Sequence, residues 1–360
     1  MKNYIPQRIA EMKEYQPDTS NPQIKLDANE SPFPTPEKIV RLLRENICYS
    51  DINRYPDPDM KELLGSYGRY ISVSPDRIVA GDGSDELIAL IINTFLCDGG
   101  KFLVCDPDFS MYTFYSDFAG CETVRYRKKN GILTDFCELS ALVKKEDVKL
   151  VMFSNPCNPT GVIADRKTVI DFVRSCDALV VVDEAYMEFS PVSQSVISET
   201  EQLKNLIVLK TVSKLGLAGL RCGFSVSCKE LAATLRKTKS PYNMNSVTQK
   251  AVSVAMDSIE EYRVNIEKIK DGVKYLYSQL KEYSDKLGFY MPESSANFVY
   301  MKFGEDDEAK SLHVYLKERG ISVRFAPGSL RVTAGTEKEN RFFINAVAEY
   351  SDNIDSRKWK

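Results

Sequence analysis

The feature of this sequence that most restricts its fold is a regular alternation of short apolar runs with helical patterns between Arg77 and Ser227. Runs such as KLVMF and ALVVVD are apolar at almost every position rather than at every second one. A strand of this kind must be covered on both faces, which is typical of parallel sheets. The sequence therefore predicts an α/β fold with a mainly parallel sheet sandwiched by helices, in which ligands bind at the carboxyl ends of the strands.

Composition narrows the possible partners. With 360 residues, of which 43% are apolar, the chain can fill roughly two domains. Its formal net charge of -3 gives no strong field for nucleic acid or anionic lipid. The N-terminus has no apolar segment of signal-peptide length, and no run approaches the length of a membrane span. We therefore expect a cytoplasmic protein with no nucleic-acid or membrane partner.

Histidine and cysteine usage excludes several kinds of catalysis. The only histidine, His313, lies in a helical pattern and is expected on a helix surface, so that a Ser-His-Asp or multi-histidine site is nearly excluded. The nine cysteines never fall as C-x-x-C and are expected to be reduced thiols. We expect no metal site.

The chain divides into three parts. Residues 1–28 resemble an arm, and the segment IKLDANESPFPTP has too many prolines for regular structure. Residues 29–245 hold the alternating pattern and form a large α/β domain. Residues 246–360 fit a smaller α+β domain, entered by one long linking helix over roughly Ser246 to Tyr283.

One lysine stands in a suggestive place in the stretch from Leu206 to Phe224. Lys214 follows Ser213 at the end of an apolar run, and Arg221 comes seven residues later. A lysine amine can form a Schiff base with an aldehyde, while a hydroxyl and a guanidinium can bind its phosphate. The stretch alone fits a solvated lysine in a glycine turn equally well.

The segment GDGSDELI provides an anion site. It follows a strand and opens a helix, so the backbone amides of Gly83, Ser84 and Asp85 would face an anion at the positive end of the helix dipole. Glu86 stands where a dinucleotide fingerprint needs glycine. Taken alone, the segment favours a plain helix cap at Ser84 over an anion site.

Two further loops follow apolar strands. Asp183 ends the strand in VVVDEAY, and a nucleotide-binding P-loop that would make it a metal ligand is missing. A buried carboxylate beneath a pyridine ring explains Asp183 better, because it keeps the ring nitrogen protonated. Tyr186 and Asn158, the latter in SNPCNPTG, could both donate to the ring's phenolate oxygen.

Three other residues have two readings each. Arg324 and Arg331 lie in strands amid apolar neighbours, where a guanidinium needs an anion. Arg331 favours a substrate anion, whereas Arg324 fits a substrate or an internal carboxylate equally. Tyr55, in the rigid turn RYPDP, either contacts a ligand or covers a local apolar patch.

Taken together, these segments resemble a known family. The chain carries, in the order of that family, the motifs LDANESP, RYPDP, GDGSDELI, DPDFSMY, NPCNPTG, VDEAYMEF, TVSKLGLAGLRCGF, PYNMN, ANFVYM and LRVTAGTEKEN. It is similar over nearly its whole length to the histidinol-phosphate aminotransferases, which are fold-type I enzymes dependent on pyridoxal 5'-phosphate. Many matches in one order are far more specific than any single motif.

The resemblance implies a role for each candidate residue. Lys214 would carry the internal aldimine and then shuttle a proton, Asp183 would pair with the pyridine nitrogen, and Asn158 and Tyr186 would hold the phenolate oxygen. Phe109 would stack on the ring. The cofactor's phosphate would be held by Gly83, Ser84, Asp85, Ser213 and Arg221, and by Tyr55 from the partner subunit of a homodimer with shared active sites. The substrate would be bound by Arg331 and, more weakly supported, by Arg324, Asn29 and Tyr15.

Two departures from the family pattern stand out. Phe109 occupies a position that is usually tyrosine, so stacking survives but a hydroxyl is lost. The segment from Lys214 to Arg221 is one residue shorter than the commoner form, which leaves the geometry of Arg221 open.

The activity implied is transamination of L-histidinol phosphate with 2-oxoglutarate, giving imidazole acetol phosphate and glutamate in a ping-pong cycle of histidine biosynthesis. Within the class, the alternatives are an aromatic amino-acid aminotransferase and a threonine-phosphate decarboxylase. From another class, the alternative is a nucleotide-binding or catalytically silent regulatory module.

Overall fold

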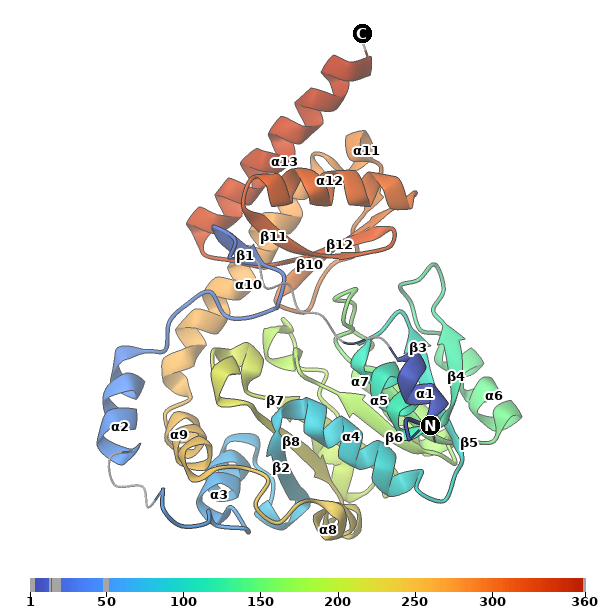
Figure 1. The fold of residues 1–360 in the computed structure, drawn as a ribbon, viewed down its shortest axis with the longest axis vertical. Coiled ribbons are helices and arrows are strands. Elements are labelled where there is room, and N and C mark those ends of the chain that lie inside the picture. The colour runs from blue at the N-terminus through green and yellow to red at the C-terminus, as the bar shows by residue number, and fades with distance from the viewer. Residues whose placement is uncertain (1–3, 13, 15–20, 48–51, 359–360) are drawn as a thin grey trace.

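The computed structural model describes residues 4–12, 14, 21–47 and 52–358. Two sheets organise it, a larger one in the lower part of Figure 1 and a smaller one above it. The α-helices are α1 (Gln7–Glu11), α2 (Glu37–Ile47), α3 (Lys61–Ile71), α4 (Gly83–Phe95), α5 (Met111–Ala119), α6 (Phe136–Glu146), α7 (Arg166–Ser175), α8 (Lys229–Thr238), α9 (Ser246–Asp257), α10 (Glu260–Lys281), α11 (Ser284–Leu287), α12 (Asp306–Glu318) and α13 (Glu337–Lys358). Short 3-10 turns are η1 (Pro75–Arg77), η2 (Met187–Phe189), η3 (Ile197–Glu201), η4 (Ser213–Leu215) and η5 (Ala218–Leu220).

The larger sheet has the spatial order β2 (Ile78–Asp82), β8 (Cys222–Ser227), β7 (Leu206–Thr211), β6 (Leu179–Asp183), β5 (Val148–Ser154), β3 (Lys101–Asp106) and β4 (Glu122–Arg127). The strands from β7 to β4 are parallel, while β8 is antiparallel to β2 and β7. The prediction of a mainly parallel sheet sandwiched by helices is confirmed.

Both faces of this sheet are buried, which explains its continuous apolar strands. In β5, Val151 and Phe153 pack with residues of α6 and α7, whereas Leu150 and Met152 pack on the other face with residues of α4 and α8. The same alternation holds in β6 and β7. Successive side chains of a strand point to opposite faces, so a strand covered by helices on both sides needs apolar residues throughout.

The smaller sheet has the order β1 (Ile24–Leu26), β11 (Ile321–Ala326), β12 (Ser329–Thr333), β10 (Phe298–Phe303) and β9 (Phe289–Tyr290). Its core includes residues of α10, α12 and α13. The prediction of no regular structure in IKLDANESPFPTP is wrong at its start, where β1 pairs in parallel with β11. Ile24 and Leu26 precede the prolines and are buried on either side of exposed Lys25. The predicted boundaries after residues 28 and 245 stay a prediction.

The prediction of one long helix from Ser246 to Tyr283 is also wrong, because α9 ends at Asp257 and α10 begins at Glu260. Ser258 has φ -123° and ψ 28°, which is not helical. The acidic residues of the first turn of α10 are a helix start signal that the continuous apolar spacing concealed.

Several other expectations can be compared with the described residues. No helix among them is both long and apolar enough to span a membrane, and no group of three or more His, Cys, Asp or Glu is arranged to hold a metal ion. The cysteines in this part of the chain are free thiols. His313 lies on α12, half-buried, with its ring 5.3 Å from that of Phe325.

Candidate active site

A cavity lies at the carboxyl edge of the larger sheet, where β5, β6 and β7 end. It brings together predicted residues from across the chain: Ser84, Asp85, Phe109, Asn158, Asp183, Tyr186, Ser213, Lys214 and Arg221. It is also lined by residues that were not predicted: Tyr112, Ser154, Ala185 and Thr211. The position matches the expected ligand site of a parallel sheet.

Asp183, the last residue of β6, is the buried carboxylate of this cavity. Its Oδ2 accepts a hydrogen bond from the Tyr112 hydroxyl at 2.8 Å, and its Oδ1 accepts one from the Ala185 amide at 3.0 Å. Burial raises the pKa of Asp183 to about 6, although both hydrogen bonds favour the charged form and oppose this rise. In the described residues no basic side chain pairs with Asp183, so the carboxylate faces the cavity with neutral partners only.

Lys214 lies in η4, directly after β7, and faces the same cavity. Its Nζ is 5.9 Å from the centre of the Tyr186 ring. The neighbouring Ser213 is fixed by Thr211, whose Oγ1 donates to the Ser213 hydroxyl at 2.9 Å and accepts from the Ser213 amide at 3.1 Å. An amine and a hydroxyl therefore meet at one edge of the cavity.

The shorter segment after Lys214 still brings Arg221 to the start of α4. Arg221 follows the turn η5 in a left-handed conformation with φ 46°, and its Nη2 donates to Asp85 Oδ2 at 3.1 Å. Gly83 has φ 77°, and a Cβ there would lie 2.7 Å from Arg221 Nη2. Glycine thus lets the guanidinium approach the helix terminus closely.

Gly83 itself does not line the cavity. Its amide donates to the Arg221 carbonyl at 3.1 Å, so of the three predicted amide donors only Ser84 and Asp85 belong to residues that line the cavity. Tyr55 also lies outside the cavity of its own chain: it is 81% exposed and stacks on Tyr242, with ring centres 4.6 Å apart. Tyr15 lies outside the described residues.

A buried ion pair supports the loop that carries Asn158. The backbone amide of Asn158 donates to Ser154 Oγ at 2.9 Å, and the Ser154 hydroxyl donates to Asp108. Asp108 pairs with Lys128 at 3.2 Å, and both side chains are only 2% exposed. Burial opposes the charge of Lys128, but Asp108 together with the neighbouring Cys157 and Cys105 outweighs it and raises the pKa of Lys128.

The two strand arginines lie beside this loop. Arg331 on β12 donates to Asn158 Oδ1 and, at 2.8 Å, to the Asp27 carbonyl. Arg324 on β11 is paired directly opposite Arg331 in the sheet register, so both side chains project from the same face. Asn29, which is 1% exposed, donates from Nδ2 to the Tyr186 hydroxyl at 2.9 Å.

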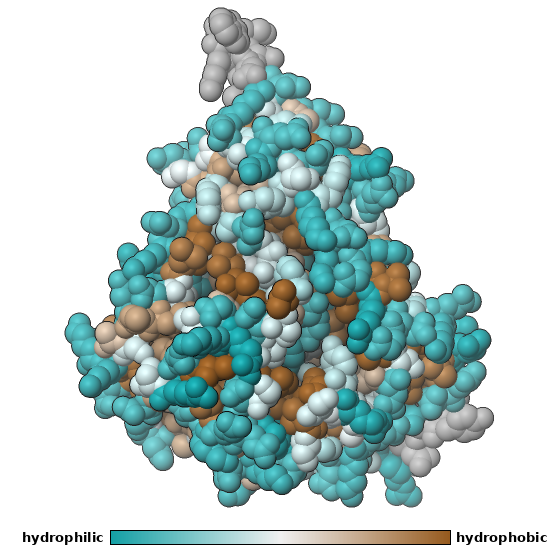
Figure 2. Space-filling model, turned by 180° about the vertical axis from the view of Figure 1, so that it is seen from behind, coloured by the Kyte–Doolittle hydropathy of each residue, from teal (hydrophilic) through white to brown (hydrophobic). Residues whose placement is uncertain are grey.

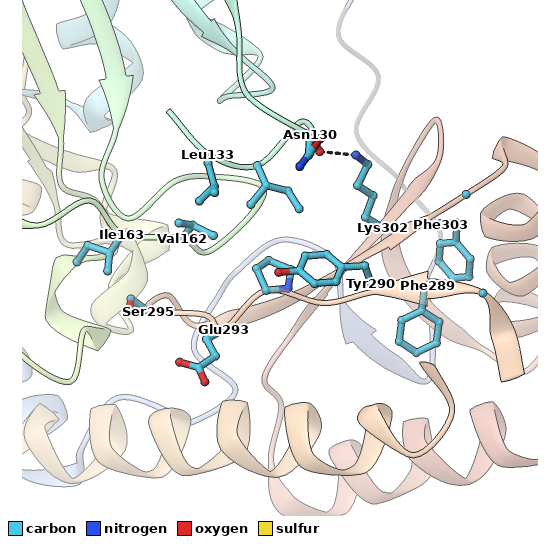
Figure 3. A pocket seen from close by; sticks show the side chains of 14 residues that line it. Asn130, Leu133, Val162, Ile163, Phe289, Tyr290, Glu293, Ser295, Lys302 and Phe303 are labelled. Carbon is cyan, nitrogen blue, oxygen red and sulfur yellow. Dashed lines mark hydrogen bonds between the residues drawn. The ribbon is translucent and has the colours of Figure 1, made fainter. Parts of the chain in front are cut away.

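A wider pocket lies between the two sheets (Figure 3). Its lining residues do not combine a buried carboxylate, an amine and a guanidinium as the cavity around Lys214 does. The side chains of Leu133, Val162 and Ile163 face that of Tyr290 across the wider pocket. Its lysine, Lys302, donates to the Asn130 carbonyl and so ties the smaller sheet to the loop after β4. We therefore place the candidate site in the cavity around Lys214.

Some contacts of the site could not be found from motifs, although Asp108 and Tyr112 both lie in the motif DPDFSMY. Tyr112 is 71 positions before Asp183 in the sequence, and Asp108 and Lys128 lie in different segments. Phe109 precedes α5, and the Tyr112 amide donates to the Phe109 carbonyl at 3.1 Å, so the turn that starts the helix brings the two ring centres to 5.5 Å.

Comparison with known proteins identifies the family. The model of the family described as "Aminotransferase class I and II" matches residues 21–347. The chain belongs to the class I and II aminotransferases. It is 34% identical to the histidinol-phosphate aminotransferase of Caldanaerobacter subterraneus subsp. tengcongensis, over 97% of this chain and 99% of that one. The predicted resemblance to histidinol-phosphate aminotransferases is confirmed.

Solved structures agree on the fold of this aminotransferase. The crystal structure of histidinol-phosphate aminotransferase from Sinorhizobium meliloti in complex with pyridoxal-5'-phosphate has a TM-score of 0.88 at 23% identity, over 98% of both chains. L-threonine-O-3-phosphate decarboxylase from Porphyromonas gingivalis has a TM-score of 0.76 at 20% identity, over 91% of this chain and 99% of that one. The predicted fold-type I architecture is confirmed.

Proposed function

We propose that this aminotransferase transfers the amino group of L-histidinol phosphate to 2-oxoglutarate, giving imidazole acetol phosphate and glutamate, with pyridoxal 5'-phosphate as cofactor. The observation that carries the proposal is the cavity in which Lys214, Asp183 and Arg221 meet, in a chain 34% identical to a histidinol-phosphate aminotransferase. The reaction belongs to histidine biosynthesis and runs as two half-reactions at one site.

The residues of the cavity fit this cofactor. Asp183 is a buried carboxylate whose pKa is about 6 and whose described partners are neutral, which suits a protonated pyridine nitrogen as its missing counter-charge. Arg221 and the amides at the start of α4 suit a phosphate. Asn158 and Tyr186 line the same cavity and would be the donors for the ring's oxygen. When bound, pyridoxal phosphate supplies a carbonyl that binds amines and a ring that accepts electrons.

The chain's own groups then divide the work. Lys214 would hold the cofactor through its amine and, once the substrate amine has displaced it, the free amine would carry the proton from the substrate's α-carbon to the cofactor. Asp183 holds a proton on the ring nitrogen through its charge. Phe109 and Ala185 line the cavity as apolar walls, which limit the access of water.

The two strand arginines suit the far end of the substrate. Arg324 and Arg331 are cross-strand neighbours of like charge, an arrangement that an anion between them stabilises. A substrate phosphate or the distal carboxylate of glutamate could occupy the same place, so that one anion site serves both half-reactions. Tyr15 stays a weaker candidate from the sequence resemblance.

We further propose a homodimer with shared active sites. Tyr55 does not line the cavity of its own chain and is 81% exposed, as expected of a side chain that reaches the phosphate site of a second subunit. Apolar side chains also gather across the middle of the face shown in Figure 2, as on a surface that a partner covers. With biosynthetic bacterial relatives, we place the enzyme in the cytoplasm.

The test is an amino-donor panel with the purified, cofactor-loaded protein and 2-oxoglutarate. Glutamate should form fastest with histidinol phosphate and more slowly with phenylalanine. Faster turnover of phenylalanine would make the protein an aromatic aminotransferase, and release of carbon dioxide from O-phosphothreonine without amino transfer would make it a decarboxylase. A colourless protein that cannot be reconstituted with pyridoxal phosphate would contradict both the cofactor and the enzyme class.

A further inference from the structure

Asn29 is held rigidly at the junction between the two sheets. It lies after β1, is 1% exposed, and has a left-handed backbone with φ 54°, which short polar side chains tolerate better than most. Its amide donates to Thr333 Oγ1 at 3.0 Å, and its carbonyl accepts from Asn297 Nδ2 at 3.0 Å. Both of these partners are also buried.

These contacts fix which way the Asn29 side chain faces. The Thr333 hydroxyl accepts the Asn29 backbone proton and donates its own proton to Asn29 Oδ1 at 3.0 Å. In this arrangement the side-chain oxygen of Asn29 faces Thr333, and the NH2 group faces the other way. There it donates to the Tyr186 hydroxyl oxygen at 2.9 Å.

The orientation of Asn29 determines the direction in which Tyr186 can donate its hydroxyl proton. Since the Tyr186 oxygen accepts from Asn29, the hydroxyl proton must be donated in another direction, and the described residues offer it no hydrogen-bond acceptor. The ring is held edge-on by Phe298, with ring centres 5.2 Å apart, and it lines the cavity beside Lys214. The proton is thereby turned into the cavity.

We infer that Asn29 is a positioning residue that aims the Tyr186 hydroxyl proton at the ring oxygen of the cofactor, rather than a residue that binds substrate. The inference rests on the proposed function, because it needs pyridoxal phosphate in this cavity. It also makes the smaller sheet part of the cofactor's environment, since Thr333 on β12 orients the amide that orients Tyr186.

The test is the pH at which the visible absorbance of the cofactor-loaded protein changes. A donor to the ring oxygen favours its anionic form and so lowers this midpoint. Asn29→Asp replaces the donor with an acceptor, so that the Tyr186 proton turns to the new carboxylate and away from the cavity. The midpoint should rise by about half to one pH unit, the equivalent of one hydrogen bond, and Tyr186→Phe should raise it in the same direction.

A double variant separates this role from a simple charge effect. If Asn29 acts through Tyr186, adding Asn29→Asp to Tyr186→Phe should leave the midpoint where Tyr186→Phe puts it. An equal further rise in the double variant would overturn the inference, as would an unchanged midpoint in Asn29→Asp accompanied by a higher KM for histidinol phosphate.

Two controls keep the outcome interpretable. If Asn29→Asp does not fold, Thr333→Val removes the hydroxyl that orients the Asn29 amide and should raise the midpoint by a smaller amount. Unchanged behaviour of Thr333→Val would then count against the inference. A wild-type protein with no visible band would overturn the proposed cofactor as well, whereas a normal band with an unmoved midpoint overturns the role of Asn29 alone.

Discussion

Two carboxylates at the end of β6 are neighbours in sequence and opposites in environment. Asp183 faces the cavity, where a tyrosine and a backbone amide are its described partners. Glu184 is fully buried on the other side, where it accepts from Ser195 Oγ at 2.6 Å and from the Val196 amide at 2.8 Å. Glu184 also lies 3.5 Å from Lys210.

Burial raises the pKa of Glu184 as well, but Lys210 and the bonds from Ser195 and Val196 oppose that rise from inside the chain. Lys210 pairs with Glu184 and, at 2.7 Å, with Glu188, and these anions raise the pKa of Lys210 despite its burial. Burial raises the pKa of Asp183 to about 6 without a cation to offset it. A structural carboxylate thus has a cation of the same chain as its counter-charge, whereas a carboxylate at a functional site receives its counter-charge from a bound ligand.

The largest expected effect on the free energy of unfolding comes from removing the cation that Glu184 and Glu188 share. Lys210→Met leaves Glu184 and Glu188 without their shared cation, and removing one partner of a buried ion pair costs about 3–5 kcal/mol. Denaturant unfolding measures the loss. Lys229→Met is the matched control, because its pair with Asp76 is exposed and should hardly matter. Equal midpoints for both variants would show that the Glu184 network is not structural.

In the cofactor-free protein, neutralising Asp183 should increase the free energy of unfolding rather than lower it. Because its folded pKa is about 6 and the ordinary value is 3.8, the native state binds more protons, and stability falls as pH rises through this interval, by about 3 kcal/mol in total. Asp183→Asn should remove that fall and be the more stable protein at pH 7, while losing on the order of 10²-fold or more in turnover when loaded. Parallel stability profiles from pH 4 to 7 would refute the argument.

Tyr112 should have a smaller, pH-dependent effect. Tyr112→Phe removes a donor to the ionised Asp183, which raises the pKa of Asp183 further and costs about 1–3 kcal/mol at pH 8. At pH 5, where Asp183 is mostly protonated, the cost should shrink. Thermal unfolding at both pH values checks this, and an identical loss at both would mean that the tyrosine acts by packing alone.

The smallest effect is expected at the phosphate end. Gly83→Ala places a side chain in a left-handed backbone, 2.7 Å from Arg221 Nη2, at a cost of about 1–2 kcal/mol. The displaced guanidinium should weaken binding of pyridoxal phosphate more than binding of pyridoxal, which equilibrium titration can compare. Gly219→Ala, with open space around its Cβ, is the control. A similar loss for both ligands would place the phosphate elsewhere.

The sequence could predict the fold class and those site residues that stand at the ends of strands or in motifs. Asp183 ends an apolar strand, and Asn158 and Lys214 follow two others. Parallel strands bring their carboxyl ends to one edge, so the meeting of these residues was foreseeable. The fold class follows from the same strands. Partners contributed by distant segments were not foreseeable, because the Tyr112 bond to Asp183 and the Asn29 bond to Tyr186 depend on how helices and sheets pack.

Local rules also competed with one another. The apolar spacing of Ser246 to Tyr283 continues through Ser258, so periodicity alone missed a break that the acidic start of α10 signals. The prolines near residue 32 led to the prediction of an irregular segment, although Ile24 and Leu26 alternate with the exposed Lys25 as in a strand. This strand forms because it pairs with the edge of β11.

The most direct measurement is a single turnover without a keto acid. Cofactor-loaded protein is mixed with L-histidinol phosphate, and imidazole acetol phosphate is counted per active site. The wild type should form one equivalent and shift its visible absorbance, while Lys214→Ala should form none on the same timescale. No ketone from the wild type, or the same yield and rate from Lys214→Ala, would contradict the assignment of this cavity as the site of amino transfer.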